Sequence, residues 1–209
     1  IPSVAAICVY PNFVKTVREL LTDESVQVAC VSGCFPASQS FIEVKIAETA
    51  LAIAAGADEI DIVLNLGAFL AGDYSEAATE IEEQKATARD ARLKVILETG
   101  ALREPEAIRR AAILALFAGA DFLKTSTGKE YPGADLVAAY ILCSVLREYH
   151  EKYGQLRGVK FSGGIRTPGD AVKYYCIVEA VLGKEWLTNE LFRIGTSSLV
   201  ESLERELVG

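Results

Sequence analysis

The 209-residue chain has no methionine, a single tryptophan and a single histidine, His150. One histidine excludes a multi-histidine zinc or iron site, because such sites take several imidazole ligands. The residue lies in the polar stretch from Arg147 to Lys152, so we expect it on an exposed helix face. A Ser-His-Asp triad built on His150 is therefore not expected.

Long apolar runs and positive charge are also scarce. No stretch of 18 or more apolar residues is free of charge, so no membrane span is expected. A cationic leader followed by an apolar segment is absent, so we see no secretory signal. The chain carries 21 Lys and Arg against 29 Asp and Glu, a net charge of −8. That balance argues against a general nucleic-acid surface, although local basic sites for a small anion stay open.

The five cysteines contain no CxxC pair and lie mostly in apolar runs. This usage favours a reduced, cytoplasmic protein over a disulfide scaffold. Cys8 has the character of a small buried residue.

Short apolar runs alternate with longer amphipathic stretches along the chain. The expected strands are Val4–Tyr10, Val26–Ser32, Glu59–Asn65, Lys94–Gly100, Phe122–Gly128, Gly158–Gly164 and Phe192–Ser197. The expected helices are Glu43–Ala55, Ser75–Ala91, Glu104–Ala118, Leu136–Tyr149, Pro168–Leu182 and Ser198–Leu207. Buried strands alternating with helices predict a parallel α/β fold. No linker interrupts the pattern, so residues 1–209 are interpreted as one domain.

A closed (β/α)8 TIM barrel is favoured over an open doubly wound sheet. An open dinucleotide-binding sheet should show GxGxxG after its first strand, and Pro11-Asn12-Phe13 has no glycine. Residues 56–61 also resemble residues 119–124, an offset of about two βα units that places Asp61 and Lys124 at equivalent positions. Seven strands are counted where a barrel needs eight. The abrupt apolar start suggests that the first strand precedes residue 1.

Charged residues stand inside three of these expected strands, namely Asp61, Lys124 and Lys160. Burying a charge is costly unless the group is paired or functional. Two ammonium groups in one low-dielectric cavity repel each other, which lowers a lysine pKa toward neutrality. A neutral amine can attack a carbonyl to form a Schiff base, and a nearby carboxylate can move protons. A buried Lys–Asp pair that only balances charge is the alternative.

Glycine-rich turns follow the last two expected strands, at Gly163-Gly164-Ile165-Arg166 and Gly195-Thr196-Ser197-Ser198. In barrels these loops often bind phosphate, because glycines let backbone N–H groups approach and a helix N-terminus favours anions. Arg166 and Lys129 could add positive charge. A phosphate site is therefore predicted beside the lysines.

These motifs resemble the deoxyribose-phosphate aldolase family of class I aldolases, along essentially the whole chain. The most specific stretch is Gly119-Ala120-Asp121-Phe122-Leu123-Lys124-Thr125-Ser126-Thr127-Gly128-Lys129. Residues 59–63, 94–100 and 159–167 also match the family pattern. The resemblance implies a TIM barrel, no metal or other cofactor, and cleavage of 2-deoxy-D-ribose 5-phosphate to D-glyceraldehyde 3-phosphate and acetaldehyde. Barrels of this family often form homodimers, although the sequence itself gives no oligomeric state.

The resemblance assigns roles residue by residue. Lys124 matches the Schiff-base lysine, Lys160 the second lysine that perturbs it, and Asp61 the proton-relay aspartate. Cys8 matches a cysteine near the small aldehyde. Phosphate contacts carry over onto Gly128, Lys129, Gly163, Gly164, Arg166, Gly195, Ser197 and Ser198.

Several features depart from the family. An N-terminal Asp-His-Thr or Asp-Leu-Thr strand motif has no counterpart, and the chain stops without the tyrosine that some C-terminal tails carry. Residues 32–38 vary the usual Gly-Phe-Pro turn, and Phe161 stands beside Lys160 where the family has Pro or Ala. Glu98, expected inside a strand, is interpreted as an indirect contributor that balances the lysine pair.

Two other functions stay open. Another phosphosugar enzyme on the same barrel, an isomerase or a different class I aldolase, would use the phosphate loops without trapping a carbonyl on Lys124. A non-catalytic barrel that serves as a binding module is the second alternative.

Overall fold

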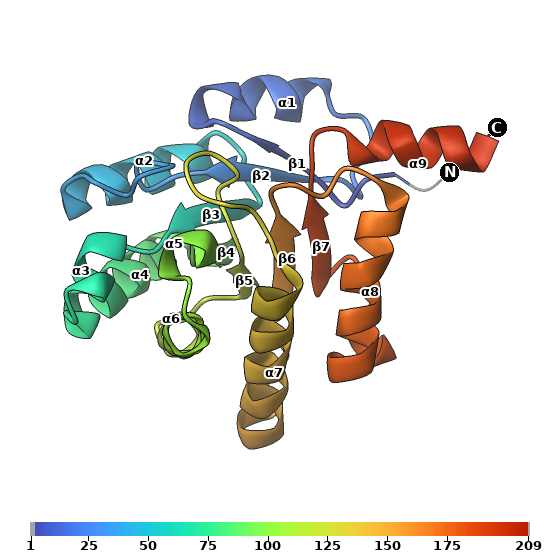
Figure 1. The fold of residues 1–209 in the computed structure, drawn as a ribbon. Coiled ribbons are helices and arrows are strands. Elements are labelled where there is room, and N and C mark those ends of the chain that lie inside the picture. The colour runs from blue at the N-terminus through green and yellow to red at the C-terminus, as the bar shows by residue number, and fades with distance from the viewer. Residues whose placement is uncertain (1–2, 209) are drawn as a thin grey trace. The chain divides into compact units, whose positions relative to one another are not determined.

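The computed structural model describes residues 3–208. Its seven strands form one parallel sheet in the order of the chain (Figure 1). They are β1 (Ala6–Val9), β2 (Gln27–Val31), β3 (Glu59–Val63), β4 (Arg92–Ile96), β5 (Phe122–Lys124), β6 (Gly158–Ser162) and β7 (Phe192–Gly195). The parallel α/β architecture with chain-ordered strands confirms the predicted fold class. An eighth strand before residue 1 stays a prediction.

Helices follow the strands in the described part of the chain. They are α1 (Val14–Leu20), α2 (Ile42–Ala54), α3 (Leu66–Leu70), α4 (Tyr74–Ala88), α5 (Thr99–Leu102), α6 (Pro105–Phe117), α7 (Leu136–Tyr153), α8 (Pro168–Leu182) and α9 (Leu199–Val208), with 3-10 turns η1 (Pro11–Phe13) and η2 (Lys184–Trp186). Among them, no helix has both the length and the hydropathy to cross a bilayer.

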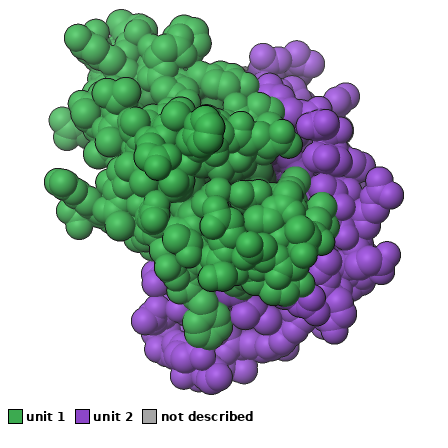
Figure 2. Space-filling view, turned by 90° about the vertical axis from the view of Figure 1, so that its left-hand side faces the viewer, with its two compact units in different colours: residues 1–96, 114–121 green, residues 97–113, 122–209 purple. Residues whose placement is uncertain are grey.

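The chain divides into two compact units, coloured separately in Figure 2. Unit 1 contains residues 1–96 and 114–121, and unit 2 contains residues 97–113 and 122–209. Within unit 1, α2 packs against α4, and within unit 2, α7 packs against α8 (Figure 1). The prediction of one domain over residues 1–209 stays a prediction.

Most expected elements are present, with shorter strands. Helix α8 has the predicted bounds, and α6 begins at Pro105, one residue after the expected start at Glu104. Helix α1 was missed, because it is only seven residues long and buries only Val14, so it leaves little apolar periodicity. The expected strand 94–100 is wrong at its end, since β4 stops at Ile96 and Glu98 adopts a left-handed backbone conformation with φ 52°.

The sequence similarity between residues 56–61 and 119–124 corresponds to the same set of contacts at the starts of β3 and β5. Asp58 accepts a hydrogen bond from the Val28 backbone at 2.8 Å, and Asp121 accepts one from Leu93 at 2.9 Å. Each carboxylate also pairs with a cation from an earlier helix, Arg18 for Asp58 and Lys85 for Asp121. The repeat therefore joins each strand to the one before it, and it sets Asp61 and Lys124 each as the third residue of its strand.

His150 is on a helix as predicted, but it is half-buried rather than exposed. It lies in the last turn of α7, where its ring meets the buried Trp186 edge-on with ring centroids 5.3 Å apart. Trp186 in turn donates to the Arg157 carbonyl at 2.9 Å. The histidine is thus part of the packing between α7 and η2.

Candidate active site

Lys124 and Lys160 are brought together by strand register. They are paired positions of β5 and β6, at Cα partners in a parallel ladder, and the Thr125 N–H donates to the Lys160 carbonyl at 3.1 Å. Both are buried, with 5% and 7% of their surface exposed. The two lysines are thus buried side chains at paired positions of adjacent strands.

The strand beyond them adds a third cation and a glycine. Arg193 of β7 is the register partner of Lys160 and lies over the Phe122 ring, 5.9 Å from its centroid. Gly195 faces the lysine, because a Cβ there would stand 3.1 Å from the Lys160 Cε and 3.0 Å from the Ser162 Cβ. Glycine at 195 therefore makes room for the Lys160 stem.

Phe161 does not face the lysine. Alternation along β6 turns it to the opposite side, where its ring packs 5.0 Å from Tyr174 and 6.0 Å from Phe192. This departure from the family pattern is thus accommodated in the packing between β6, β7 and α8.

The predicted phosphate residues of unit 2 lie on three loops that touch one another. The Gly128 and Gly163 backbones lie close together, because a Cβ on Gly163 would stand only 3.5 Å from the Gly128 Cα. The Thr196 hydroxyl donates to the Ile165 carbonyl at 3.0 Å, which ties the loop after β7 to the loop after β6. Gly128, Gly163 and Gly164 all have positive φ, which glycine adopts without strain.

Helix N-termini and exposed cations complete this loop cluster. Thr167 caps α8 through the Asp170 N–H, and Thr196 accepts from the Leu199 N–H at the start of α9. Both helices begin with the positive end of their dipoles in these loops. Lys129, Arg166, Ser197 and Ser198 are exposed there. Sequence reasoning missed Thr196, whose position directly before Ser197 in the glycine-rich turn was the available signal.

Asp61 belongs to a buried ion network in unit 1. The Lys94 Nζ lies 3.0 Å from the Asp61 Oδ1 and 2.5 Å from the Glu59 Oε2, and all three side chains are fully buried. Arg92 lies 3.4 Å from Glu59 on the more exposed side. Lys94 thus pairs with Asp61 and orients its side chain. Lys94 was missed because it begins an expected strand, although a lysine in an apolar run is the same signal that marked Lys160.

Cys8 is exposed on β1, so the interpretation of it as a buried residue is wrong. Its neighbour Cys30 is buried on β2, and burial together with nearby Cys8, Glu48 and Asp61 raises the pKa of the Cys30 thiol to about 12. The two cysteines therefore differ in environment, with Cys8 open to solvent and Cys30 buried and protonated at neutral pH. All five cysteines are free.

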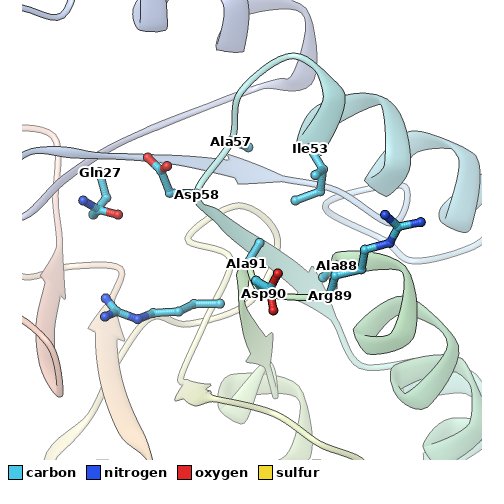
Figure 3. A pocket seen from close by; sticks show the side chains of 9 residues that line it. Gln27, Ile53, Ala57, Asp58, Ala88, Arg89, Asp90 and Ala91 are labelled. Carbon is cyan, nitrogen blue, oxygen red and sulfur yellow. The ribbon is translucent and has the colours of Figure 1, made fainter. Parts of the chain in front are cut away.

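A hollow of about 430 Å³ in unit 1 lies at the starts of β2, β3 and β4, where Gln27, Asp58 and Arg92 line it (Figure 3). Catalytic sites of (β/α)8 barrels lie at the carboxyl ends of the strands. This hollow lies at the amino ends, so it is not a candidate for the catalytic site. Two of its charged groups are also paired, Asp58 with Arg18 and Arg92 with Glu59.

Comparisons with known proteins agree with this arrangement. The chain is 38% identical over 205 residues to the deoxyribose-phosphate aldolases of Mus musculus and Homo sapiens, covering 97% of this chain and 64% of theirs. It thus spans less than two thirds of the length of these curated relatives. Its fold superposes on the tetrameric deoxyribose phosphate aldolase from Aeropyrum pernix with a TM-score of 0.73 at 30% identity, covering 96% of this chain and 76% of that one.

A second aldolase, QR15, gives a TM-score of 0.79 at 32% identity, covering 98% of this chain and 84% of that structure. The triosephosphate isomerase from Bartonella henselae shares the fold alone, with a TM-score of 0.56 at 12% identity over 91% of this chain and 78% of that one. The family model of the DeoC/LacD family aldolases matches residues 2–181. The chain therefore belongs to the DeoC/LacD aldolase family.

Proposed function

We propose that the protein is a 2-deoxy-D-ribose-5-phosphate aldolase that works through a Schiff base on Lys124. The observation that carries the proposal is the register pairing of two buried lysines on β5 and β6. Burial and a like charge each disfavour the ammonium form, so Lys160 keeps a fraction of Lys124 neutral and nucleophilic. Family membership supports this chemistry over an isomerase or a non-catalytic binding module.

The reaction begins when the Lys124 amine attacks the C1 aldehyde of the open-chain sugar phosphate and water leaves to give an iminium. Asp61 takes the proton of the C3 hydroxyl, and the C2–C3 bond breaks with its electrons moving into the iminium to form an enamine. D-Glyceraldehyde 3-phosphate departs. Protonation of the enamine at C2 and hydrolysis then release acetaldehyde and restore Lys124.

The phosphate is assigned to the loops after β5, β6 and β7, in unit 2. Gly128, Gly163, Gly164 and Gly195 allow close backbone approach, while Lys129, Arg166, Ser197 and Ser198 offer charge and donors. Binding energy from this remote group positions C1 for attack. Cys8 is assigned to the small-aldehyde end of the substrate on the family resemblance and its exposure.

The proposal extends to the setting of the enzyme. Free cysteines agree with a reducing cytoplasm, and no metal or organic cofactor takes part in the steps above. A homodimer is proposed from the family resemblance, and the Aeropyrum pernix relative is described as a tetramer. Phosphosugar and acetaldehyde are the proposed small-molecule partners.

The test is release of acetaldehyde from deoxyribose 5-phosphate by the purified chain. Lys124→Leu should abolish release, because no other group supplies the amine at that position. Lys173→Leu is the matched control, since Lys173 is an exposed residue of α8 paired with Asp170. Release that survives in Lys124→Leu would overturn the proposal.

A further inference from the structure

Glu98 is a buried carboxylate that the reaction above does not use. It follows β4 with φ 52° and ψ 58°, a left-handed conformation that is uncommon for a residue with a side chain, and only 2% of its surface is exposed. Backbone hydrogen bonds of the residues on either side fix its position. The Leu97 N–H donates to the Lys124 carbonyl at 2.9 Å, and the Thr99 N–H donates to the Thr125 carbonyl at 2.9 Å.

Both carboxylate oxygens of Glu98 accept hydrogen bonds from Thr127. The Oε1 receives the Thr127 backbone N–H at 3.1 Å, and the Oε2 receives the Thr127 hydroxyl at 2.5 Å. A carboxylate that accepts two such bonds gives a charge-assisted pair, stronger than bonds between neutral groups. Glu98 thus grips the residue directly before Gly128 and Lys129.

The hydroxyl of Thr127 also fixes the residues that follow it. Its Oγ1 accepts the Lys129 backbone N–H at 3.2 Å, which closes a tight turn around Gly128. Gly128 has φ 73° and its backbone meets that of Gly163. The chain from Glu98 through Thr127 therefore sets the conformation of the turn that faces the glycine loop after β6.

The far end of the same loop is fixed by close backbone contacts. A Cβ on Gly100 would clash with the Pro132 carbonyl, and a Cβ on Gly133 would clash with the Gly163 backbone. The Ala134 N–H also donates to the Ser162 carbonyl at 3.0 Å. Glu98 secures the beginning of the loop, and these contacts secure its end.

We propose that Glu98 is a positioning residue for phosphate binding, which holds the Thr127–Lys129 turn in the conformation that receives the substrate phosphate. The inference rests on the proposed function for the identity of the phosphate ester. It replaces the interpretation of Glu98 as a counter-charge for the lysine pair, because the oxygens of Glu98 are directed to Thr127. Its consequence is that the preference for a phosphorylated over an unphosphorylated sugar depends on Glu98.

The experiment compares kcat/KM for 2-deoxyribose 5-phosphate and for 2-deoxyribose in five single variants and one double variant. Glu98→Ala removes both acceptors, and Thr127→Val removes the hydroxyl with little change of shape. Glu98→Gln keeps one acceptor and can donate to the Thr127 hydroxyl, and Thr127→Ser keeps the hydroxyl. Glu106→Ala, an exposed acidic residue at the start of α6, is the control.

We expect the preference for the phosphorylated sugar to fall about tenfold or more in Glu98→Ala and Thr127→Val, chiefly through KM, as for loss of a charge-assisted hydrogen bond. Glu98→Gln and Thr127→Ser should recover most of that preference. The double variant Glu98→Ala/Thr127→Val should be no worse than either single variant, since both cut the same chain of bonds.

An equal loss of kcat/KM with both sugars would overturn the proposal. A shifted pH profile in Glu98→Gln with an unchanged preference for the phosphorylated sugar would also overturn it, because that result would show that Glu98 acts on the lysines. Binding of inorganic phosphate, followed by calorimetry, tests the same inference without chemistry. Weaker phosphate binding in Glu98→Ala, recovered in Glu98→Gln, supports it even if the wild-type chain cleaves neither sugar. Unchanged phosphate binding in Glu98→Ala contradicts it.

Discussion

At the scale of single residues, the account depends on charged side chains placed inside strands. Lys124, Lys160 and Asp61 could be found from sequence, because a charge in an apolar run is rare and costly. Lys94 and Arg193 carry the same signal at the starts of the expected strands and were passed over. Which carboxylate pairs with which lysine could not be found, since it depends on register: Asp61 faces Lys94 across β3 and β4.

Lys160→Leu should shift Schiff-base formation toward higher pH. Under the proposed mechanism, removing Lys160 relieves the repulsion that disfavours protonated Lys124, so less neutral amine should be present at pH 7. We expect the trapping rate at pH 7 to fall at least about tenfold, with recovery at alkaline pH. The pH–rate profile measures this, and a profile that keeps its midpoint would contradict it.

Gly195→Ala should lower kcat more than it raises KM. The new Cβ would meet the Lys160 Cε at 3.1 Å, so the lysine stem must move while the loops keep their contacts. Gly169→Ala is the matched control, because a Cβ there finds its nearest neighbour at 3.9 Å. Steady-state kinetics separate the two effects, and a change confined to KM would instead make Gly195 a phosphate contact alone.

At the scale of elements, the repeat Gly-Ala-Asp explains how strand starts are fixed. The repeat was visible in the sequence, but the contacts that it makes were not. The partners of Asp58 and Asp121 come from helices and strands 28 to 40 residues away. Strand ends were also overestimated. Leu97, Thr99, Thr125 and Thr127 keep apolar or β-branched character although they lie beyond the ends of β4 and β5. No local pattern marks the left-handed turn at Glu98.

Asp121→Ala should destabilise the fold without altering the chemistry. It leaves the buried Leu93 N–H without its carboxylate acceptor and removes the partner of Lys85, a loss of about 1–3 kcal/mol in the free energy of unfolding. Asp90→Ala, an exposed neighbour, is the control. Urea unfolding gives the free energy, and full stability in Asp121→Ala would show that the repeat is not structural.

The buried thiol of Cys143, in α7, should make the free energy of unfolding fall at alkaline pH. Burial raises the pKa of this thiol from 9.0 to about 12, so the folded state keeps the proton that the unfolded state loses above pH 9. The contribution of this thiol to the free energy of unfolding is complete below pH 9. It is lost as the pH rises toward 12, at about 1.4 kcal/mol per pH unit.

Cys143→Ala should flatten that decline, whereas Cys176→Ala, at an exposed position of α8, should leave it unchanged. Unfolding free energies measured between pH 8 and 11 decide the matter. Equal slopes in the wild type and Cys143→Ala would contradict the assignment.

At the scale of the whole molecule, strand–helix alternation was enough to predict the fold class, because period and burial repeat seven times along the chain. The two compact units were not visible, since the break falls at residues 96–97 and 113–122, inside an unbroken α/β pattern. The loop residues proposed for phosphate binding were selected from the glycine-rich turns and the family resemblance. Their mutual contacts, such as Thr196 with Ile165, needed the three-dimensional structure.

The central claim is tested most directly by trapping the covalent intermediate. The chain is incubated with deoxyribose 5-phosphate, reduced with borohydride, digested and mapped by mass spectrometry. The account predicts one reduced adduct, on Lys124, that disappears in Lys124→Leu and persists in Lys173→Leu. An adduct on another lysine, or none at saturating substrate, would contradict the Schiff-base aldolase.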